Sequence, residues 1–233
     1  MPVIFLSSGH SCPVSSFIPP DPETQQMKGK PGCRVYLLRH GETANAPQVC
    51  LNGHYDVALS EKGWNQSRQL AQAFKSVPIH SIYCSDLQRA HEGARLIAEP
   101  HNLKPLACPE LRELSFGQWE GLSLKELQKK HPGDLERRLK HTETFRAEGG
   151  ESFQELQDRV IPKFEEIIAR HAEDSIVLMC HGGVNRTILS HILGAPISRL
   201  FRISQKYAAV NIIQFYPDHP VVELTNGTHN DIL

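Results

Sequence analysis

The chain has 233 residues, enough for one large α/β domain with a substantial core or for two small domains. Its 25 Lys and Arg residues balance 26 Asp and Glu residues, so the formal net charge is only -1. This balance argues against a partner bound by bulk electrostatic attraction, such as nucleic acid or an anionic membrane, and any anion site must be local.

The start of the chain differs in composition from the rest. It is rich in Ser and Pro without an apolar period, so we expect a disordered or loosely attached extension over residues 1–30, followed by one domain over 31–233. Its apolar segment, residues 3–6, is too short for a signal peptide and lacks a basic region before it. Met27 would make an ordinary start, which leaves open whether residues 1–26 belong to the native protein.

The cysteines occur singly, without a C-x-x-C pair, so neither a metal site nor a disulfide framework is supported. We therefore expect no metal, no cofactor and reduced thiols in a cytoplasmic protein. No stretch approaches the roughly 20 apolar residues that span a bilayer. The six cysteines are Cys12, Cys33, Cys50, Cys84, Cys108 and Cys180.

In the first half of the chain, strands and helices are expected to alternate. Residues 34–38 form a short apolar, β-prone run, and residues 79–84 form a second. Helices are predicted over 60–75, with Trp64, Ala71 and Phe74 on one face, and over 86–99.

The second half begins with an irregular segment, residues 110–150. Ser123 and Ser152 each open a capping-box pattern, and the second precedes a long amphipathic helix extending to His171. Pro162 should bend that helix or remove one of its hydrogen bonds.

Residues 175–180 give the clearest strand prediction, and a helix is expected to start near Val184. Two closing strands are predicted over 210–216 and 221–225, separated by a turn. The alternation of strands and helices predicts a three-layer α/β/α sandwich with a mostly parallel sheet.

Polar residues stand at the ends of three of these strands: Arg39-His40, Ser85-Asp86 and His181, which precedes Gly182. Because ligands bind at the carboxyl ends of parallel strands, we expect these distant segments to form one site.

The residues at this edge suit a phosphate ester. Arg39 and Arg89 provide planar, permanently charged groups that match phosphate oxygens. His40 and His181 provide imidazoles, which are nucleophilic when neutral, and the Gly after each allows close backbone approach.

A leaving alkoxide needs a proton, and three carboxylates are candidates for the acid: Glu42, Glu113 and Glu120. Composition alone does not choose among them. His54, His91 and His191 have no comparable setting and are interpreted as structural or solvent-facing, and Cys84 and Cys180 as packing residues.

With these residues in this order, the chain resembles the histidine phosphatase superfamily, also called the phosphoglycerate mutase-like family. The resemblance covers residues 34–222 and consists of five segments in order. They are RHGET at 39–43, LSEKG at 59–63, YCSDLQRA at 83–90, LRELSFGQWEG at 111–121 and HGGV at 181–184.

The resemblance implies a role for each matching residue and the phosphoglycerate mutase-like fold. His40 would be the nucleophile that forms phosphohistidine, and Glu113 would protonate the leaving group. Arg39, Arg89 and His181 would hold the phosphoryl group. Further phosphate or substrate contacts would come from Asn45, Asn52, Gly53 and Gly182.

Two positions depart from the family pattern. An asparagine is common where Ala46 stands, so either Asn45 takes over its phosphate contact or the contact is missing. A threonine is common where Gly93 stands, a change that touches no proposed chemistry.

The short cap at about 121–150 resembles the phosphatase branch, and most closely the alpha-ribazole phosphatases of cobalamin synthesis. Broad-specificity phosphatases are similar, so the alcohol of the substrate is left open. The alternatives are a phosphoglycerate mutase and an inactive phosphate-binding module. The expected partner is a small phosphomonoester, and a homodimer is left open as the assembly.

Overall fold

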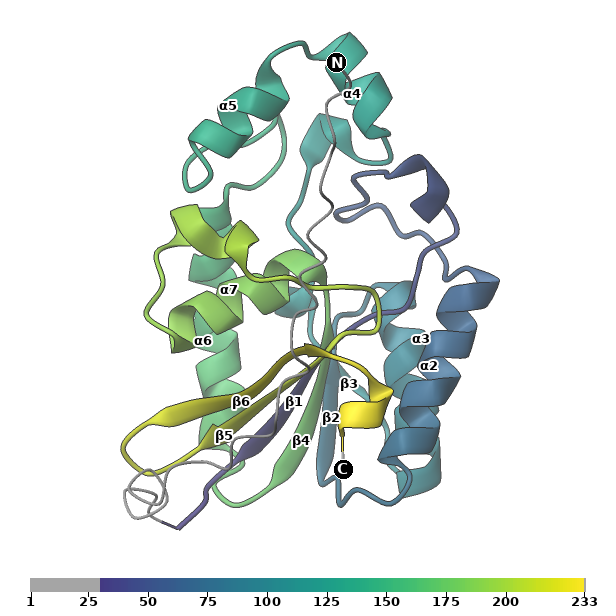
Figure 1. Cartoon of the computed structure of the whole chain (residues 1–233), viewed down its shortest axis with the longest axis vertical. Helices are drawn as coiled ribbons and strands as arrows, with labels where there is room; N and C mark the ends of the chain where they lie inside the picture. Colours follow the sequence, from purple (N-terminus) through teal and green to yellow (C-terminus); the bar gives the residue numbers. More distant parts are fainter. Residues whose placement is uncertain (1–29, 233) are drawn as a thin grey trace, which may run out of the picture.

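The computed structural model describes residues 30–232, which form a six-stranded sheet with helices on both sides (Figure 1). The predicted extension, apart from Lys30, and Cys12 lie outside the described residues. The strands are β1 (Arg34–Arg39), β2 (Ser81–Cys84), β3 (Leu106–Ala107), β4 (Ser175–Cys180), β5 (Val210–Phe215) and β6 (Pro220–Gly227).

The sheet has the order β3-β2-β4-β1-β5-β6. The four strands β3, β2, β4 and β1 are parallel, whereas β5 and β6 extend the sheet antiparallel. β1 and β4 are therefore central and end side by side, with Arg39 paired to Cys180. The predicted sandwich with a mostly parallel sheet is confirmed, and the side-by-side ends bring residues 40 and 181 together.

The helices are α2 (Glu61–Phe74), α3 (Gln88–Ala98), α4 (Leu124–Lys130), α5 (Asp134–Lys140), α6 (Phe153–Ala169) and α7 (Gly182–Ile192). Because side chains alternate along a strand, β1 contributes to two separate cores. Val35 and Leu37 pack in the core that α6 and α7 cover, and Tyr36 and Leu38 pack in the core that α2 and α3 cover.

The helix starts agree with the capping patterns. Ser60 caps α2, and both Ser123 and Ser152 form complete capping boxes. The predicted apolar face of α2 was partly wrong, because Leu70 and Phe74 are its buried large residues while Trp64 and Ala71 are only half-buried.

The structure also shows the surroundings of Pro162 and Gly93, two residues that are unusual inside a helix. Pro162 lies on the exposed side of α6, which continues through it, so water can reach the carbonyl that lacks its usual partner. Gly93 lies where α3 meets the sheet, since a Cβ there would come within 3.1 Å of Met179 Cε.

The irregular middle of the chain contains two short helices that periodicity did not predict. α4 and α5 lie beyond the carboxyl ends of the strands, at the top of Figure 1. Within residues 30–232, no helix is long and apolar enough to cross a membrane. All five cysteines in that part of the chain are free thiols.

Candidate functional site

A cavity of about 320 Å³ opens where β1 and β4 end and α3 and α7 begin. One part, here called the inner end, is lined by Arg39, His40, Arg89, Gly182 and Gly183, and the buried His181 ring packs against that of His40. Its other part, the outer end, is formed by Phe116, Leu135, Arg138, Leu139, Phe153 and Phe201. The cavity therefore joins the predicted polar residues to an apolar region contributed largely by α5 and neighbouring loops.

His40 is held as a neutral imidazole with one defined tautomer. Its Nδ1 lies 2.7 Å from the carbonyl oxygen of Gly41, so Nδ1 must carry the proton and donate it to that carbonyl. Burial, and then the charges of Arg89 and Arg39, lower the pKa of His40 well below its ordinary value. In this neutral form Nε2 keeps a free lone pair, as a nucleophile requires.

His181 lies against His40, with ring centroids 5.1 Å apart in an edge-to-face arrangement. The side chain is fully buried, and neither ring nitrogen has a hydrogen-bond partner among the described residues. Burial, with the charge of Arg89, lowers the pKa of His181 well below its ordinary value. A buried imidazole without partners has donor capacity in reserve, which a bound oxyanion can use.

Arg39 and Arg89 are each anchored by backbone carbonyls. Arg89 donates to the carbonyls of Gly53, at 2.6 Å, and Tyr55, at 3.1 Å. Arg39 donates to the carbonyl of Gln205 at 2.5 Å and lies 4.2 Å from the ring centroid of Tyr207. These contacts fix the position of each guanidinium without neutralising it, because a carbonyl carries no net charge.

The structure separates the three candidate acids. Glu42 binds Ser60 Oγ and Lys62 Nζ, and is thereby turned toward the start of α2. Glu120 accepts from the backbone of His54 and of Phe116, so it ties two loops together. Of the three, only Glu113 lines the cavity, where its carboxylate accepts from the backbone N–H groups of Leu114 and Gly183.

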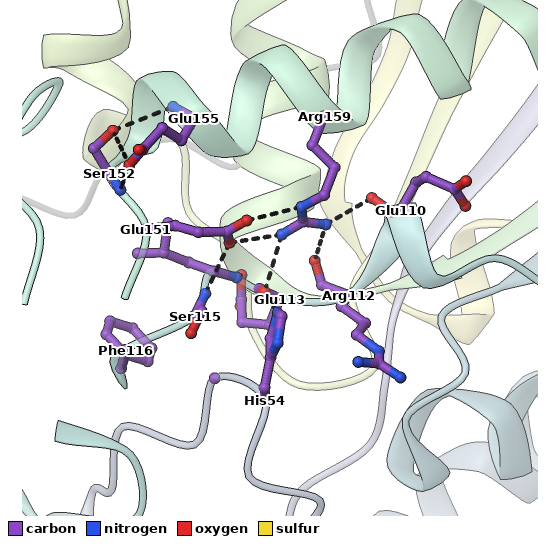
Figure 2. Close-up of polar contacts among 12 residues, drawn as sticks. His54, Glu110, Arg112, Glu113, Ser115, Phe116, Glu151, Ser152, Glu155 and Arg159 are labelled. Carbon is purple, nitrogen blue, oxygen red and sulfur yellow. Dashed lines mark hydrogen bonds and ion pairs between the residues drawn. The ribbon is translucent and has the colours of Figure 1, made fainter. Parts of the chain in front are cut away.

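The loop that carries Glu113 is held by Arg159 of α6 (Figure 2). Arg159 donates to the carbonyls of Glu110, at 2.7 Å, and Arg112, at 3.0 Å, and pairs with Glu151 at 2.7 Å. Glu151 in turn accepts from the backbone N–H of Ser115. His54 is half-buried, and its Nε2 lies 2.9 Å from the Glu113 carbonyl oxygen. This contact gives His54 a structural role in holding the same loop.

Close backbone approach explains several glycines of the site. A Cβ at Gly183 would lie 2.3 Å from Glu113 Oε1, so only glycine leaves room for that carboxylate at the start of α7. A Cβ at Gly41 would lie 2.4 Å from the carbonyl oxygen of Gly63, where the loop after β1 touches α2. The LSEKG segment therefore supports the loop that contains His40.

The family model of the histidine phosphatase superfamily (branch 1) matches residues 35–228. The chain belongs to this superfamily. It is 29% identical over 195 residues to Phosphoserine phosphatase 1 of Hydrogenobacter thermophilus, covering 84% of this chain and 92% of that protein. It is also 29% identical over 188 residues to the Adenosylcobalamin/alpha-ribazole phosphatase of Escherichia coli, covering 78% and 91%.

Among solved structures, the fold matches Bacillus stearothermophilus YhfR with a TM-score of 0.80 and 26% identity, covering 84% of this chain and 98% of that one. The predicted family, fold and enzyme class, a phosphoric monoester hydrolase, are confirmed. The roles of individual residues stay predictions.

Where this histidine phosphatase departs from the family pattern, Asn45 lies next to Asn52. The Asn45 amide donates to Asn52 Oδ1 at 2.6 Å, and Asn52 rather than Asn45 lines the cavity, next to Gly53. Asn45 therefore holds Asn52 in place.

Three residues that line the cavity were missed by the sequence analysis. Tyr207 contacts both Arg39 and His40, with its ring centroid 5.7 Å from that of His40. Arg138 and Arg186 add two further guanidinium groups. Arg138 carried a usable signal, because at helical spacing it shares a face with the apolar Leu135 and Leu139.

The described residues contain no group of three or more His, Cys, Asp or Glu side chains placed to hold a metal ion. Cys84 and Cys180 are buried packing residues, and burial raises the pKa of Cys84 to about 12.

Proposed function

We propose that this chain hydrolyses a phosphomonoester in two steps, with His40 Nε2 as the nucleophile and a phosphohistidine as the intermediate. The observation that carries the proposal is the state of His40. It is a neutral imidazole, its tautomer is set by the Gly41 carbonyl, and the charges of Arg39 and Arg89 act on it. Such a group attacks phosphorus without first losing a proton.

In the first step a bond forms between His40 Nε2 and phosphorus while the bond from phosphorus to the ester oxygen breaks. Arg39, Arg89 and His181 stabilise the charge on the remaining phosphoryl oxygens, together with the backbone N–H groups at the start of α7. Glu113, in its protonated form, gives its proton to the leaving alkoxide, and the alcohol departs.

In the second step water attacks phosphorus from the side that the alcohol has left. Glu113, now a carboxylate, takes the proton of that water, and the bond between phosphorus and Nε2 breaks. Inorganic phosphate leaves, and His40 returns to its neutral form with Nδ1–H still donating to Gly41. Each proton and electron pair is thus returned within one cycle.

For the alcohol, alpha-ribazole stays a candidate because a relative carries that name and the cap at about 121–150 is short. Phosphoserine, named for another relative, is a second candidate. The free thiols of Cys33 and four others support a reducing, cytoplasmic location. Homodimer formation stays a prediction that light scattering would measure.

The test is to trap the intermediate. The enzyme is mixed with 4-nitrophenyl phosphate and quenched in alkali, in which a phosphorus–nitrogen bond survives, and peptides are analysed by mass spectrometry. We expect one phosphoryl group on His40, and none in the His40→Ala variant. That variant should lose at least about 10³-fold in kcat, the scale seen when a nucleophile is removed.

Phosphorylation of another residue, or undiminished turnover by His40→Ala, would overturn the mechanism. We expect EDTA to leave the rate unchanged, and inactivation that zinc reverses would equally contradict the proposal. Conversion of one phosphoglycerate isomer into another would instead indicate a mutase. Phosphate binding without any labelling or turnover would indicate the inactive binding module.

A further inference from the structure

Arg138 is a buried cation without an ion-pair partner among the described residues. It lies in α5, is 8% exposed and lines the outer end of the cavity. Within residues 30–232 its guanidinium makes no hydrogen bond or ion pair, and it lies against two aromatic rings. The guanidinium carbon lies 4.6 Å from the ring centroid of Phe116 and 5.5 Å from that of Phe153.

This environment is costly for a charged group. Burial lowers the pKa of Arg138 to about 10, which still leaves it cationic at neutral pH. Contact with aromatic faces returns part of the lost hydration energy but satisfies none of the five N–H donors. Buried arginines are ordinarily paired, so the unused donors indicate a partner that arrives with the ligand.

The charge balance of the cavity also indicates that Arg138 is paired by a group of the ligand. Four arginines line it, and among the described lining residues Glu113 is the only carboxylate. Arg39, Arg89 and Arg186 all donate to backbone carbonyls, and Arg138 alone does not. With Glu113 protonated for its proposed role, a phosphate dianion would neutralise only two of the four charges, which leaves room for a second anion.

The position of Glu113 indicates where that second anion would lie. Glu113 lines the cavity, its carboxylate accepts from the backbone N–H of Gly183 at the inner end, and its charge also acts on Arg138 at the outer end. A leaving oxygen placed at Glu113 would have its phosphorus toward the inner end. The rest of the alcohol would then extend toward Arg138, between apolar side chains such as Leu135 and Phe201.

We infer that Arg138 is a specificity-determining residue that binds a second anionic group, a carboxylate or a second phosphate, on the alcohol of the substrate. The inference rests on the proposed function, because it takes the phosphate to be bound at the inner end. A guanidinium held by aromatic faces and free to donate two parallel N–H groups matches either anion. Phosphoserine, named for one relative, carries such a carboxylate.

The test uses three esters built on one glycerol frame. Glycerol 3-phosphate has no second anion, 3-phosphoglycerate adds a carboxylate, and glycerol 1,3-bisphosphate adds a phosphate. We expect the wild-type enzyme to favour at least one of the latter two by about tenfold or more in kcat/KM, the scale of a charge-assisted hydrogen bond. Which of the two is favoured distinguishes carboxylate from phosphate.

Arg138→Met should abolish this preference by raising KM for the ester that carries the second anion, so that its kcat/KM falls to about that of glycerol 3-phosphate. Arg137→Met is the matched control and should keep the preference. Arg137 is next to Arg138 in the chain, but its guanidinium is exposed and pairs with Asp134. Arg138→Lys keeps the charge but loses the planar pair of donors, so it should keep part of the preference and serves if the Met variant does not fold.

A wild-type enzyme that hydrolyses 4-nitrophenyl phosphate through His40 but shows no preference would overturn this inference and leave the proposed function standing. A preference that survives both Arg138 variants would also overturn it. Absence of any His40-dependent hydrolysis would instead overturn the proposed function.

Discussion

The two ends of the cavity hold their arginines in different ways. At the inner end, Arg39 and Arg89 donate to backbone carbonyls, beside two histidines whose pKa values are lowered by burial. At the outer end, Arg138 lies against two aromatic rings and has no hydrogen-bond partner among the described residues. The inner end is thus organised before a ligand arrives, whereas the outer end is completed by one. This difference suggests that chemistry belongs to the first and choice of alcohol to the second.

Among substitutions that would separate the roles of the two ends, Glu113→Gln is expected to reduce kcat most. Glutamine keeps the shape but cannot donate the proton, and general acid catalysis contributes about 10²–10⁴-fold. The loss should be greatest for alkyl phosphates and much smaller for 4-nitrophenyl phosphate, whose phenolate leaves without a proton. Steady-state rates across esters of graded alcohol pKa measure this, and an equal loss for all of them would rule Glu113 out as the acid.

A smaller loss is expected for Gly183→Ala. The added Cβ would stand 2.3 Å from Glu113 Oε1, so the carboxylate must shift away from the start of α7. Misplacement on this scale costs about 10²-fold in kcat. The control is the double variant: in the Glu113→Gln background, with its acid already absent, Gly183→Ala should add little. Additive losses would show that Gly183 acts on something other than Glu113.

The smallest predicted effect concerns stability against pH. The folded-state pKa values of His40 and His181 lie well below ordinary values, chiefly because of burial, whereas in the unfolded chain these groups titrate near about 6.5. Between those limits the unfolded chain binds more protons. Protonation therefore does not oppose folding above about pH 6.5, whereas stability declines as pH falls below it, with a limiting slope of about 3 kcal/mol per pH unit for the pair.

Chemical denaturation at about pH 7.5, 6.5 and 5.5 measures this dependence. In His40→Gln one of the two groups is gone, so the part of the slope below about pH 6.5 that comes from this pair should fall to about half. An unchanged slope would mean that His40 is not buried in the neutral form. Outer-end variants such as Arg138→Met should leave the slope as it is, which separates the two ends by a property other than rate.

Much of the inner end could be predicted from the sequence because its signals are local. The apolar run of β4 stops at His181, and a strand that stops at a polar motif places that motif at the sheet edge. Glu113 could be chosen only through the family resemblance. The reason it is favoured over Glu42, which binds Lys62, lies in contacts between segments distant in sequence.

The outer end was harder to predict for a physical reason. α5 is short, and its burial depends on Phe116 and Phe153, which come from other parts of the chain. Arg137 and Arg138 are chemically alike, yet one is exposed and the other buried. β3, with two residues, was also missed because so short a strand has no period.

Arg39 and Arg89 are anchored by main-chain carbonyls, which affects how the substrate preference of such a protein can change by mutation. The carbonyls of Gln205, Gly53 and Tyr55 belong to the main chain, so side-chain replacements at those positions change the anchoring only where they disturb the local backbone. The segment around α5 takes no part in that anchoring. New alcohols could therefore be accommodated by exchanging residues there, one at a time, while the reaction centre is inherited intact.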